Sequence, residues 1–444
     1  MSQPRLLFVA APLLVESLLG LAVGLVGTLL ASRISDTAGA AFGLSNQIWG
    51  FLFILFRVIG AGISVVVSHH LGARQIASAD AVSRAALGGA MWMGLGIGAL
   101  CTLGAGGLLT AMSAPAPVAT LAKRYLQLIG IVILLEALCS AFSGVLRAHL
   151  LVRDVMKAIV VLHGVHIGFA WLLVPHFGLL GYASAMVLSR IVVLGLYAYL
   201  WRARLHLVPK LFDFFRFQRD RLRSVMAIGF PTAIEHFGWT FGFIVSVRVA
   251  AQLGEAALAT HAYAMQIGFA IITTSISIGI AAEILVGRYV GAAEFAKADA
   301  LARKALKIGI GSSLCFALIA ALLGNHLLGF FTKDSAIIAT GMSMLWIGLL
   351  IEPGRAVNII MNDTLRAAGD ARYPALAGLP SQLFVLGAGS WWLGWHLGFG
   401  LLGVWLIYAL DEWLRGLINW FRWQRKGWMP AAQKAHAAAA LSVV

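Results

Sequence analysis

The sequence predicts an all-α polytopic membrane protein with twelve transmembrane helices, arranged as two six-helix bundles related by a parallel internal repeat. Composition, a regular series of apolar segments and the repeat itself all lead to this fold class. Of the 444 residues, 60% are hydrophobic and 11% are charged, and the mean hydropathy is +0.89. Soluble proteins carry roughly a quarter charged residues, and a soluble chain of this length could not hide so much apolar surface from water.

Twelve apolar segments follow one another along the chain. Each is close to the roughly 20 residues that cross about 30 Å of hydrocarbon as a helix, and only helices satisfy their backbone hydrogen bonds within a single such segment. The expected spans are 7–32, 43–69, 86–112, 122–145, 156–175, 179–201, 225–252, 258–286, 306–331, 338–362, 374–397 and 401–421.

The basic residues predict the orientation. The net charge is +15, which in a soluble protein would suggest a nucleic-acid partner. Here 24 of the 33 Lys and Arg residues lie at the N-terminus, in the even-numbered loops or at the C-terminus, and only four lie in the odd-numbered loops. By the positive-inside rule we expect a multi-pass protein of a bacterial cytoplasmic (inner) membrane with both termini cytoplasmic, in contact with lipid and not with nucleic acid. We expect no cleavable signal peptide, because the first apolar segment is long enough to be a span.

The longest connection divides the chain into an N-terminal six-helix lobe (1–201), a linker (202–224) and a C-terminal six-helix lobe with a short cytoplasmic tail (225–444). The linker is basic and rich in Phe. An amphipathic helix at the cytoplasmic membrane interface and a solvated linker are both compatible with this composition.

A repeat supports the division. Shifting 12–87 by 219 residues aligns it with 231–306 without a gap and gives 20 identities in 76 positions. The same shift aligns Leu-Arg-Ala at 146–148 with Leu-Arg-Ala at 365–367, and Phe-Gly-Leu-Leu-Gly at 177–181 recurs at 399–403. Six spans per half is an even number, so both halves enter the membrane in the same sense, as in many transporters.

Two glutamates at equivalent positions of the repeat, Glu16 and Glu235, are the first candidates for cation coupling. Each lies in a predicted span, four residues after a proline. Ionisable residues inside a bilayer are expensive and are functional candidates by default. Small residues on the same helical face, among them Gly20 and Gly242, leave room for water, a cation or a ligand. The alternative is that both glutamates only hydrogen-bond one helix to another.

The tenth span carries a polar stripe. Helical angles place Glu352 and Asp363 almost on one line, with Arg355, Asn358 and Asn362 beside it. Such a stripe needs partners or a water-filled cavity. The two acids are candidates for cation coupling and the other three for substrate contact, whereas a structural Glu352–Arg355 ion pair is an equally good interpretation.

The remaining candidates are isolated. Glu283 is the only acid in its span and a further coupling candidate, and Gln47, Gln266 and His236 are candidates for a polar substrate cleft. We predict no catalytic residue, no metal site and no cofactor, since no phosphate-binding loop, nucleophile elbow or metal-binding motif is present. A gradient of H⁺ or Na⁺ is then the simplest energy source.

Several segments together resemble the multidrug and toxic compound extrusion (MATE) transporters, on the bacterial DNA-damage-inducible side of that family. The matching segments are AAFGLSNQI at 40–48, ALATHAYAMQI at 257–267, GIAAEILVGRYVGA at 279–292 and TLRAAGDARYP at 364–374. The resemblance covers essentially the whole chain. It implies two six-helix bundles and antiport of small organic, often cationic compounds against protons or sodium, and the repeat within one chain favours a monomer.

The sequence departs from the family pattern in the first span. Many relatives have a Val-Asp-Thr pattern where this chain has Val26, Gly27 and Thr28, and Glu16 lies roughly three turns earlier. The main alternative function is a flippase for lipid-linked saccharides, because related families share the two-lobed architecture. Such a protein needs basic residues to hold a pyrophosphate, and Arg57, Arg248 and Arg355 are available.

Overall fold

A computed structural model describes residues 6–112 and 114–441, apart from the side chains of residues 51, 53–55, 57 and 58. Arg57 lies outside these described side chains. The chain forms two compact units. The N-terminal unit comprises Val15–Leu71 and Gln75–Gly229, and the C-terminal unit comprises Met1–Leu14, Gly72–Arg74 and Phe230–Val444. Within the described residues every regular element is helical, so the all-α prediction is confirmed.

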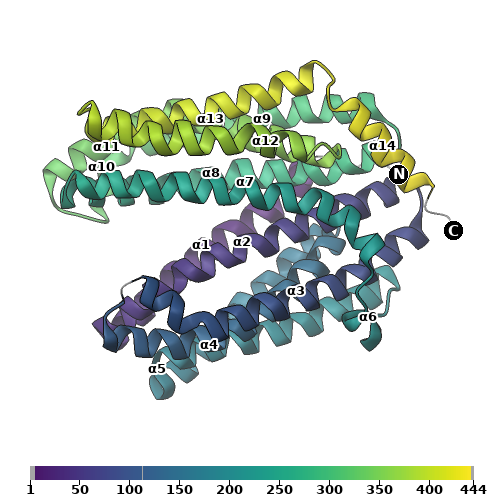
Figure 1. Ribbon diagram of the computed structural model, residues 1–444, viewed down its shortest axis with the longest axis horizontal. Helices are drawn as coiled ribbons and strands as arrows, with labels where there is room; N and C mark the ends of the chain where they lie inside the picture. The colour runs from purple at the N-terminus through teal and green to yellow at the C-terminus, as the bar shows by residue number, and fades with distance from the viewer. Residues whose placement is uncertain (1–5, 113, 442–444) are drawn as a thin grey trace. The chain divides into compact units, whose positions relative to one another are not determined.

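The N-terminal unit is built from long helices. Neighbouring helices α3, α4 and α5 pack in sequence order (Figure 1), and short α6 packs against α3. Helix α1 begins, and helix α7 ends, in the C-terminal unit. The bounds are α1 Leu6–Ile34, α2 Asp36–Gly72, α3 Ile76–Ala111, α4 Ala116–Ala148, α5 Val152–Leu205, α6 Leu211–Phe215 and α7 Arg219–Gln252.

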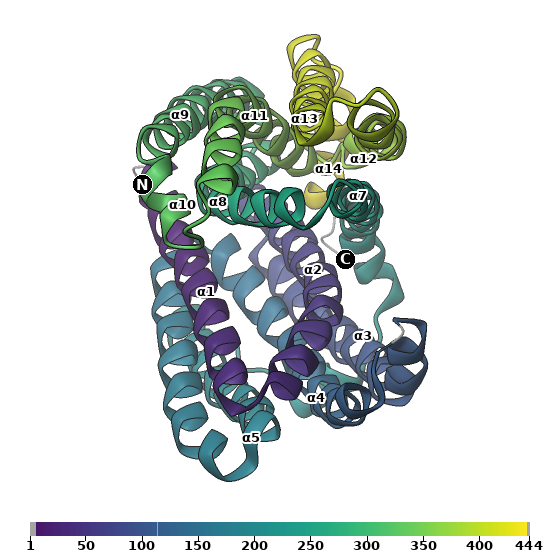
Figure 2. The same cartoon turned by 90° about the vertical axis from the view of Figure 1, so that its left-hand side faces the viewer.

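In the C-terminal unit, α11 is the central helix. It packs against α8, α9 and α13, and Figure 2 shows α9 and α13 on either side of it. A helix α14 follows α13 and packs against α8. The bounds are α8 Glu255–Gly291, α9 Phe295–Leu322, α10 Gly324–Gly329, α11 Ser335–Ala367, α12 Arg372–Pro380, the π-helices η1 Ser381–Ala388 and η2 Ser390–His396, α13 Gly400–Gln424 and α14 Met429–Ala440.

Each of the twelve predicted spans has a helical counterpart in the structure. Among the described residues, seven helices (α1, α3, α4, α5, α8, α9 and α11) are individually long and apolar enough to cross a membrane. Helix α5 has 54 residues and contains the fifth and sixth spans. The other spans correspond to α2, α7, α12 with η1 and η2, and α13. Helix α13 carries three ionisable residues in its middle turns, Asp411, Glu412 and Arg415.

The repeated Phe-Gly-Leu-Leu-Gly motif forms the same kind of turn in both halves. Gly178 (φ 55°) interrupts α5 between the fifth and sixth spans, and Gly400 (φ 59°) opens α13 after the eleventh. Glycine adopts this left-handed region without steric cost. The second glycine of each motif lies directly against a backbone carbonyl, Gly181 against Leu173 and Gly403 against Leu393. The internal repeat is therefore visible in the backbone as well as in the sequence.

Candidate functional site

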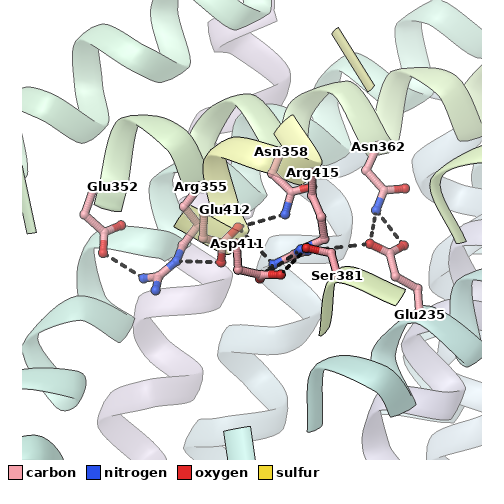
Figure 3. A network of polar contacts seen from close by, with 9 residues as sticks. All are labelled: Glu235, Glu352, Arg355, Asn358, Asn362, Ser381, Asp411, Glu412 and Arg415. Carbon is pink, nitrogen blue, oxygen red and sulfur yellow. Dashed lines mark hydrogen bonds and ion pairs between the residues drawn. The ribbon is translucent and has the colours of Figure 1, made fainter. Parts of the chain in front are cut away.

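The C-terminal unit contains a buried network of charged and polar side chains from four elements (Figure 3). Helices α7, α11 and α13 and the π-helix η1 contribute to it, and it contains five of the eleven residues selected from the sequence. Its members are Glu235, Glu352, Arg355, Asn358, Asn362, Ser381, Asp411, Glu412 and Arg415.

One end of the network is centred on Arg355. Its Nη1 donates to Oε1 of Glu352 at 2.7 Å, one turn earlier on α11. Its Nε donates to Oε1 of Glu412 on α13 at 3.2 Å. Asn358 donates from Nδ2 to the other oxygen of Glu412 at 2.8 Å. The predicted Glu352–Arg355 contact is thus present, and it joins α11 to α13.

The other end is centred on Arg415. Its Nη2 lies 2.6 Å from Oδ2 of Asp411 and 3.2 Å from Oε2 of Glu412, and Ser381 donates to Asp411 at 2.6 Å. Glu235 on α7 lies 3.9 Å from Nη1 of Arg415. The amide of Asn362 donates to both carboxylate oxygens of Glu235 at 2.6 Å. The coupling candidate of the seventh span is therefore tied to the tenth and twelfth spans.

The network contains more acid than base. Four carboxylates (Glu235, Glu352, Asp411 and Glu412) meet two guanidinium groups (Arg355 and Arg415). Glu235 is 5% exposed and Glu352 is 3% exposed. Buried charges without partners are strongly unfavourable, and the network has two more carboxylates than guanidinium groups to match them.

Oxygen atoms with no hydrogen-bond donor are a second sign of this excess of acceptor groups. Within the described residues, Oε2 of Glu352 and Oδ1 of Asn358 are buried and have no partner. Both are acceptors. A proton on Glu352, or a hard cation such as Na⁺ with oxygen ligands, satisfies an acceptor of this kind, whereas an anion does not. The donor set of the network therefore fits a small cation.

Asp363 and Glu283 belong to a second group. Arg366 bonds from Nε to Oε2 of Glu283 on α8 at 2.6 Å and from Nη2 to Oδ1 of Asp363 at 2.7 Å. The polar stripe expected on the tenth span is therefore divided between two arginines, because Glu352 bonds to Arg355 instead. Glu352 and Asp363 both lie on α11, but each bonds to a different arginine, and these arginines contact Glu412 on α13 and Glu283 on α8 respectively.

Two partly buried ion pairs lie in the N-terminal unit. Arg147 donates to Glu16 at 2.7 Å, and Arg190 donates to Glu136 at 2.9 Å. Arg190 also lies over the ring of Trp49, 5.6 Å from its centroid. Asp411 and Glu412 of the predicted twelfth span lie in the C-terminal unit. In the structure they pair with Arg415, and Arg190 pairs with Glu136.

The three remaining candidates lie outside these groups. Gln47 is exposed and Gln266 is half-buried. His236 is half-buried and its Nδ1 lies 3.1 Å from the carbonyl of Thr232 in the preceding turn. No geometry brings these three side chains to the network, and their assignment to a substrate cleft stays a prediction.

Of the two small residues expected to leave room, Gly20 has open space beside it and Gly242 does not. The space beside Gly242 is taken by the backbone of Gln382 and the side chain of Leu386, so the expectation of free room on that face of α7 is wrong at this position. A side chain at Gly27 would meet the hydroxyl of Tyr182. A residue larger than glycine at position 27 would therefore require Tyr182 to move.

Sequence reasoning left four charged residues, Arg366, Asp411, Glu412 and Arg415, out of the site. Arg366 belongs to the repeated Leu-Arg-Ala segment, and this recurrence in a predicted span boundary was the available signal. The two acids and Arg415 lie one turn apart on α13, a spacing at which ion pairs form within a single helix. Nothing in the sequence showed that α11 would lie beside them.

Comparisons with known proteins fit this arrangement. The MatE family model matches residues 12–172 and 231–387, most of both halves. The chain belongs to the MatE family. Its sequence is 30% identical over 424 residues to the uncharacterized transporter YisQ of Bacillus subtilis, and the match covers 94% of this chain and 93% of YisQ. It is 25% identical over 442 residues to the multidrug resistance protein PmpM of Pseudomonas aeruginosa, covering 94% and 85%.

Solved structures share the MATE fold. A multidrug resistance MATE family transporter of the MOP superfamily in an outward-facing conformation superposes with a TM-score of 0.88 at 20% identity, with 96% of each chain covered. A MATE protein in a bent conformation gives 0.87 at 19% identity, with 97% of this chain and 96% of the other covered. The protein is therefore a membrane transporter of the MATE multidrug-efflux family, and family membership favours efflux over the lipid-linked saccharide flippase.

Proposed function

We propose that this MATE transporter exports small organic cations by antiport with H⁺ or Na⁺, through alternating access of its two halves. The observation that carries the proposal is the excess of carboxylates over arginines in the buried network of the C-terminal unit. A site with surplus buried acid binds a cation or a proton favourably. Relatives named multidrug resistance proteins support the class of substrate.

Within this proposal the two glutamates at the ends of the network bind the coupling ion. Glu352 has an oxygen without a described partner. Glu235 bonds to the amide of Asn362 and lies farther from Arg415 than Asp411 does. Asp411 and Glu412 are held by short contacts to the arginines and keep those in place. An organic cation that enters the same negative field competes with H⁺ or Na⁺, and this competition is the basis of antiport.

The cellular setting follows from the basic residues. We propose a bacterial cytoplasmic membrane, with both termini on the cytoplasmic side, because the Lys and Arg residues are concentrated at the termini and in the even-numbered loops. The internal repeat supplies two halves within one chain, so we propose that the monomer is the transporting unit.

Transport of a cationic dye in proteoliposomes tests the proposal. A proton gradient and then a sodium gradient is imposed on vesicles with the wild type, Glu16→Gln, Glu235→Gln or Glu352→Gln. We expect dye export under one of the gradients, and loss of export in Glu235→Gln or Glu352→Gln with unchanged insertion. Absence of export under either gradient would overturn antiport and return the saccharide flippase as the leading function.

A further inference from the structure

Residues 202–224, which run from the last turn of α5 through α6 to the first turns of α7, form a basic and aromatic surface that is separate from the buried network. All seven of its Lys and Arg side chains are exposed. Of its two acids, Asp213 is buried and only Asp220 is exposed. The exposed charge is therefore strongly positive. The basic residues are Arg202, Arg204, Lys210, Arg216, Arg219, Arg221 and Arg223.

The centre of this surface, α6, is fixed to α3. Asp213 accepts a hydrogen bond from Nη1 of Arg84 at 3.0 Å and one from the backbone nitrogen of Lys210 at 2.9 Å. Trp92 donates from its indole nitrogen to the carbonyl of Phe215 at 2.9 Å. Arg84 and Trp92 lie two turns apart on α3, so α6 is held at two points and has a defined orientation.

Two glycines of α3 allow the close approach. A side chain at Gly88 would meet the carbonyl oxygen of Arg216, and one at Gly89 would meet the side chain of Leu222. The backbone of the segment therefore lies directly on α3. This is a built surface and not a solvated linker.

The side of α6 that faces away from α3 exposes large apolar groups. Phe214 turns inward, with its ring centroid 6.4 Å from that of Phe142. The outward side chains are 53–79% exposed: Leu211, Phe212, Phe215 and Phe217. Apolar side chains gathered on a rigid surface indicate a partner, and aromatic rings interleaved with arginines are typical of segments at a membrane interface.

The position along α3 gives the depth of this surface. Trp92 lies six residues inside the predicted span 86–112, which corresponds to about 9 Å at 1.5 Å per residue. The positive-inside rule puts the start of that span on the cytoplasmic side. With this orientation the carbonyl of Phe215, bonded to Trp92, lies about 9 Å inside the predicted span, which at 27 residues is about 40 Å long and extends beyond the roughly 30 Å of hydrocarbon at both ends. We therefore expect it close to the boundary between headgroups and acyl chains of the cytoplasmic leaflet.

We propose that residues 202–224 are a docking surface for acidic phospholipids. Leu211, Phe212, Phe215 and Phe217 enter the interface, and the exposed Lys and Arg side chains bind phosphate groups of anionic lipids. The apolar groups and their depth favour lipid over a nucleic acid or an acidic protein, which would need charge alone. The inference depends on the chain being a membrane protein and not on which substrate it transports.

Spin labelling in bilayers of defined composition tests the proposal. Phe212→Cys is labelled in a Cys315→Ser background, since Cys315 is exposed while Cys101 and Cys139 are buried. The protein is reconstituted in phosphatidylcholine with or without phosphatidylglycerol. We expect the label to be reached by oxygen and protected from a water-soluble nickel complex when phosphatidylglycerol is present.

A charge variant and a matched control separate this surface from general basicity. Lys210, Arg219, Arg221 and Arg223 are changed to Gln in one variant, and four exposed basic residues of the C-terminal unit in the other: Lys304, Lys307, Arg425 and Lys426. We expect the first to bind fluorescent phosphatidylglycerol roughly tenfold more weakly than the wild type and the control to bind within about twofold, since each basic residue near an anionic surface contributes separately.

Three outcomes overturn the proposal. They are a label equally open to the nickel complex in both bilayers, equal losses of lipid binding in the two variants, and equal affinity for soluble polyphosphate. If the charge variant does not fold, 1 M salt on the wild type replaces it, because the contacts to headgroups are screened at that ionic strength. Lipid binding unchanged in salt counts against the proposal in the same way.

Discussion

Equivalent positions in the two halves of the repeat carry different charges. In the N-terminal unit Arg190 donates to Glu136 at 2.9 Å. At the repeat-related positions of the C-terminal unit the polarity is reversed, with Arg355 donating to Glu412 at 3.2 Å. The repeat has therefore kept an ion pair between equivalent helices, α4 with α5 and α11 with α13, while exchanging its donor and acceptor.

The second difference concerns the acids around a conserved element of the repeat. Arg147 bonds to Glu16, but its counterpart Arg366 bonds to Glu283 and Asp363, whose counterparts in the first half are Ser64 and Gly144. Glu235, the counterpart of Glu16, bonds to Asn362 and lies 3.9 Å from Arg415. The comparison teaches that surplus acid has accumulated in one half, which we infer to be the coupling half.

Neutralising one glutamate in each half gives the largest expected contrast. Glu235→Gln should lower gradient-driven transport roughly tenfold or more, the effect of about 1.4 kcal/mol on a barrier, because it removes part of the acid surplus. Glu16→Gln should leave transport within about threefold of the wild type on the same scale, since Glu16 is matched by Arg147. Initial rates in proteoliposomes measure both. A larger loss of transport in Glu16→Gln than in Glu235→Gln would show that coupling depends on the N-terminal unit instead.

Exchanging the partners of the two reversed pairs sharpens the comparison. Either single change, Glu136→Arg or Arg190→Glu, leaves like charges buried and should destabilise the protein by about 3–5 kcal/mol. The double exchange should recover most of this loss, since it copies the polarity of the other half. The melting temperatures of the three variants in detergent give the coupling energy.

The same exchange in the C-terminal unit is the control. Arg355→Glu combined with Glu412→Arg should not recover stability, because Glu352 also bonds to Arg355 and Arg415 also contacts Glu412. Equal recovery in the two units would mean that the surrounding charges of the network do not matter, and the comparison would fail.

Removing the conserved arginine of each half is expected to have a smaller but unequal effect. Arg366→Gln removes the arginine partner of two carboxylates, Glu283 and Asp363. Arg147→Gln removes the arginine partner of one carboxylate, Glu16. The melting temperature should fall further in Arg366→Gln. The loss of unfolding free energy should be larger in that variant by about 1–3 kcal/mol, the desolvation penalty of one more unsatisfied buried group. A thermal shift assay on both variants measures it. Arg366→Gln combined with Glu283→Gln should regain part of the loss.

The smallest expected effect concerns the repeated Asp and Arg residues in the first turns of α3 and α9. Arg303 bonds to Asp299 at 2.9 Å, but in the first half Arg84 bonds to Asp213 instead of to Asp80. Burial raises the pKa of Asp80, and nearby His149 and Arg84 lower it in part. A carboxyl with a raised pKa stabilises the fold fully below its unfolded pKa of about 3.9, and this contribution is lost as the pH rises through the folded pKa.

Asp80→Asn removes that dependence. The melting temperature of Asp80→Asn relative to the wild type should therefore increase between pH 4 and pH 6, by a shift on the order of 1 °C. A series of melting curves over this range measures it. A relative melting temperature that decreases with pH would show that Arg84 still holds the Asp80 carboxylate.

Much of the fold could be predicted from the sequence, because the bilayer requires long apolar helices and these are visible in the sequence. Apolar length specifies each span, and the repeat at 219 residues specifies the two halves. The boundaries at 201 and 225 stay a prediction, since α7 begins in the N-terminal unit and ends in the C-terminal unit. The π-helices of the eleventh span were not predicted, because hydropathy carries no information on hydrogen-bond spacing.

The sequence identified several residues of the candidate site but not which of them lie together. A helical angle gives the face of Glu352 or Asp363 on its own helix, but not which helix lies opposite. The spacings of three and four residues among Asp411, Glu412 and Arg415 are those of ion pairs within one helix, and they indicate no partner on another helix. Their contacts to Arg355, Asn358 and Ser381 depend on the packing of α11 and η1 against α13, which only the tertiary structure supplies.

The π-helical span explains how the second half tolerates an insertion. The offset of the repeat is 219 residues at Arg147 and Arg366 but 222 at the Phe-Gly-Leu-Leu-Gly turns. The loops 149–151 and 368–371 account for one extra residue, and the other two lie between Arg372 and Phe399, a stretch that contains the π-helices and the turn 397–399. In an α-helix two residues would lengthen the path by about 3 Å and rotate everything beyond them. Each i→i+5 ring encloses one more residue than an α-helical ring, so the wide turns and the turn 397–399 together accommodate the extra residues. Glu412 still lies opposite Arg355, as Arg190 lies opposite Glu136.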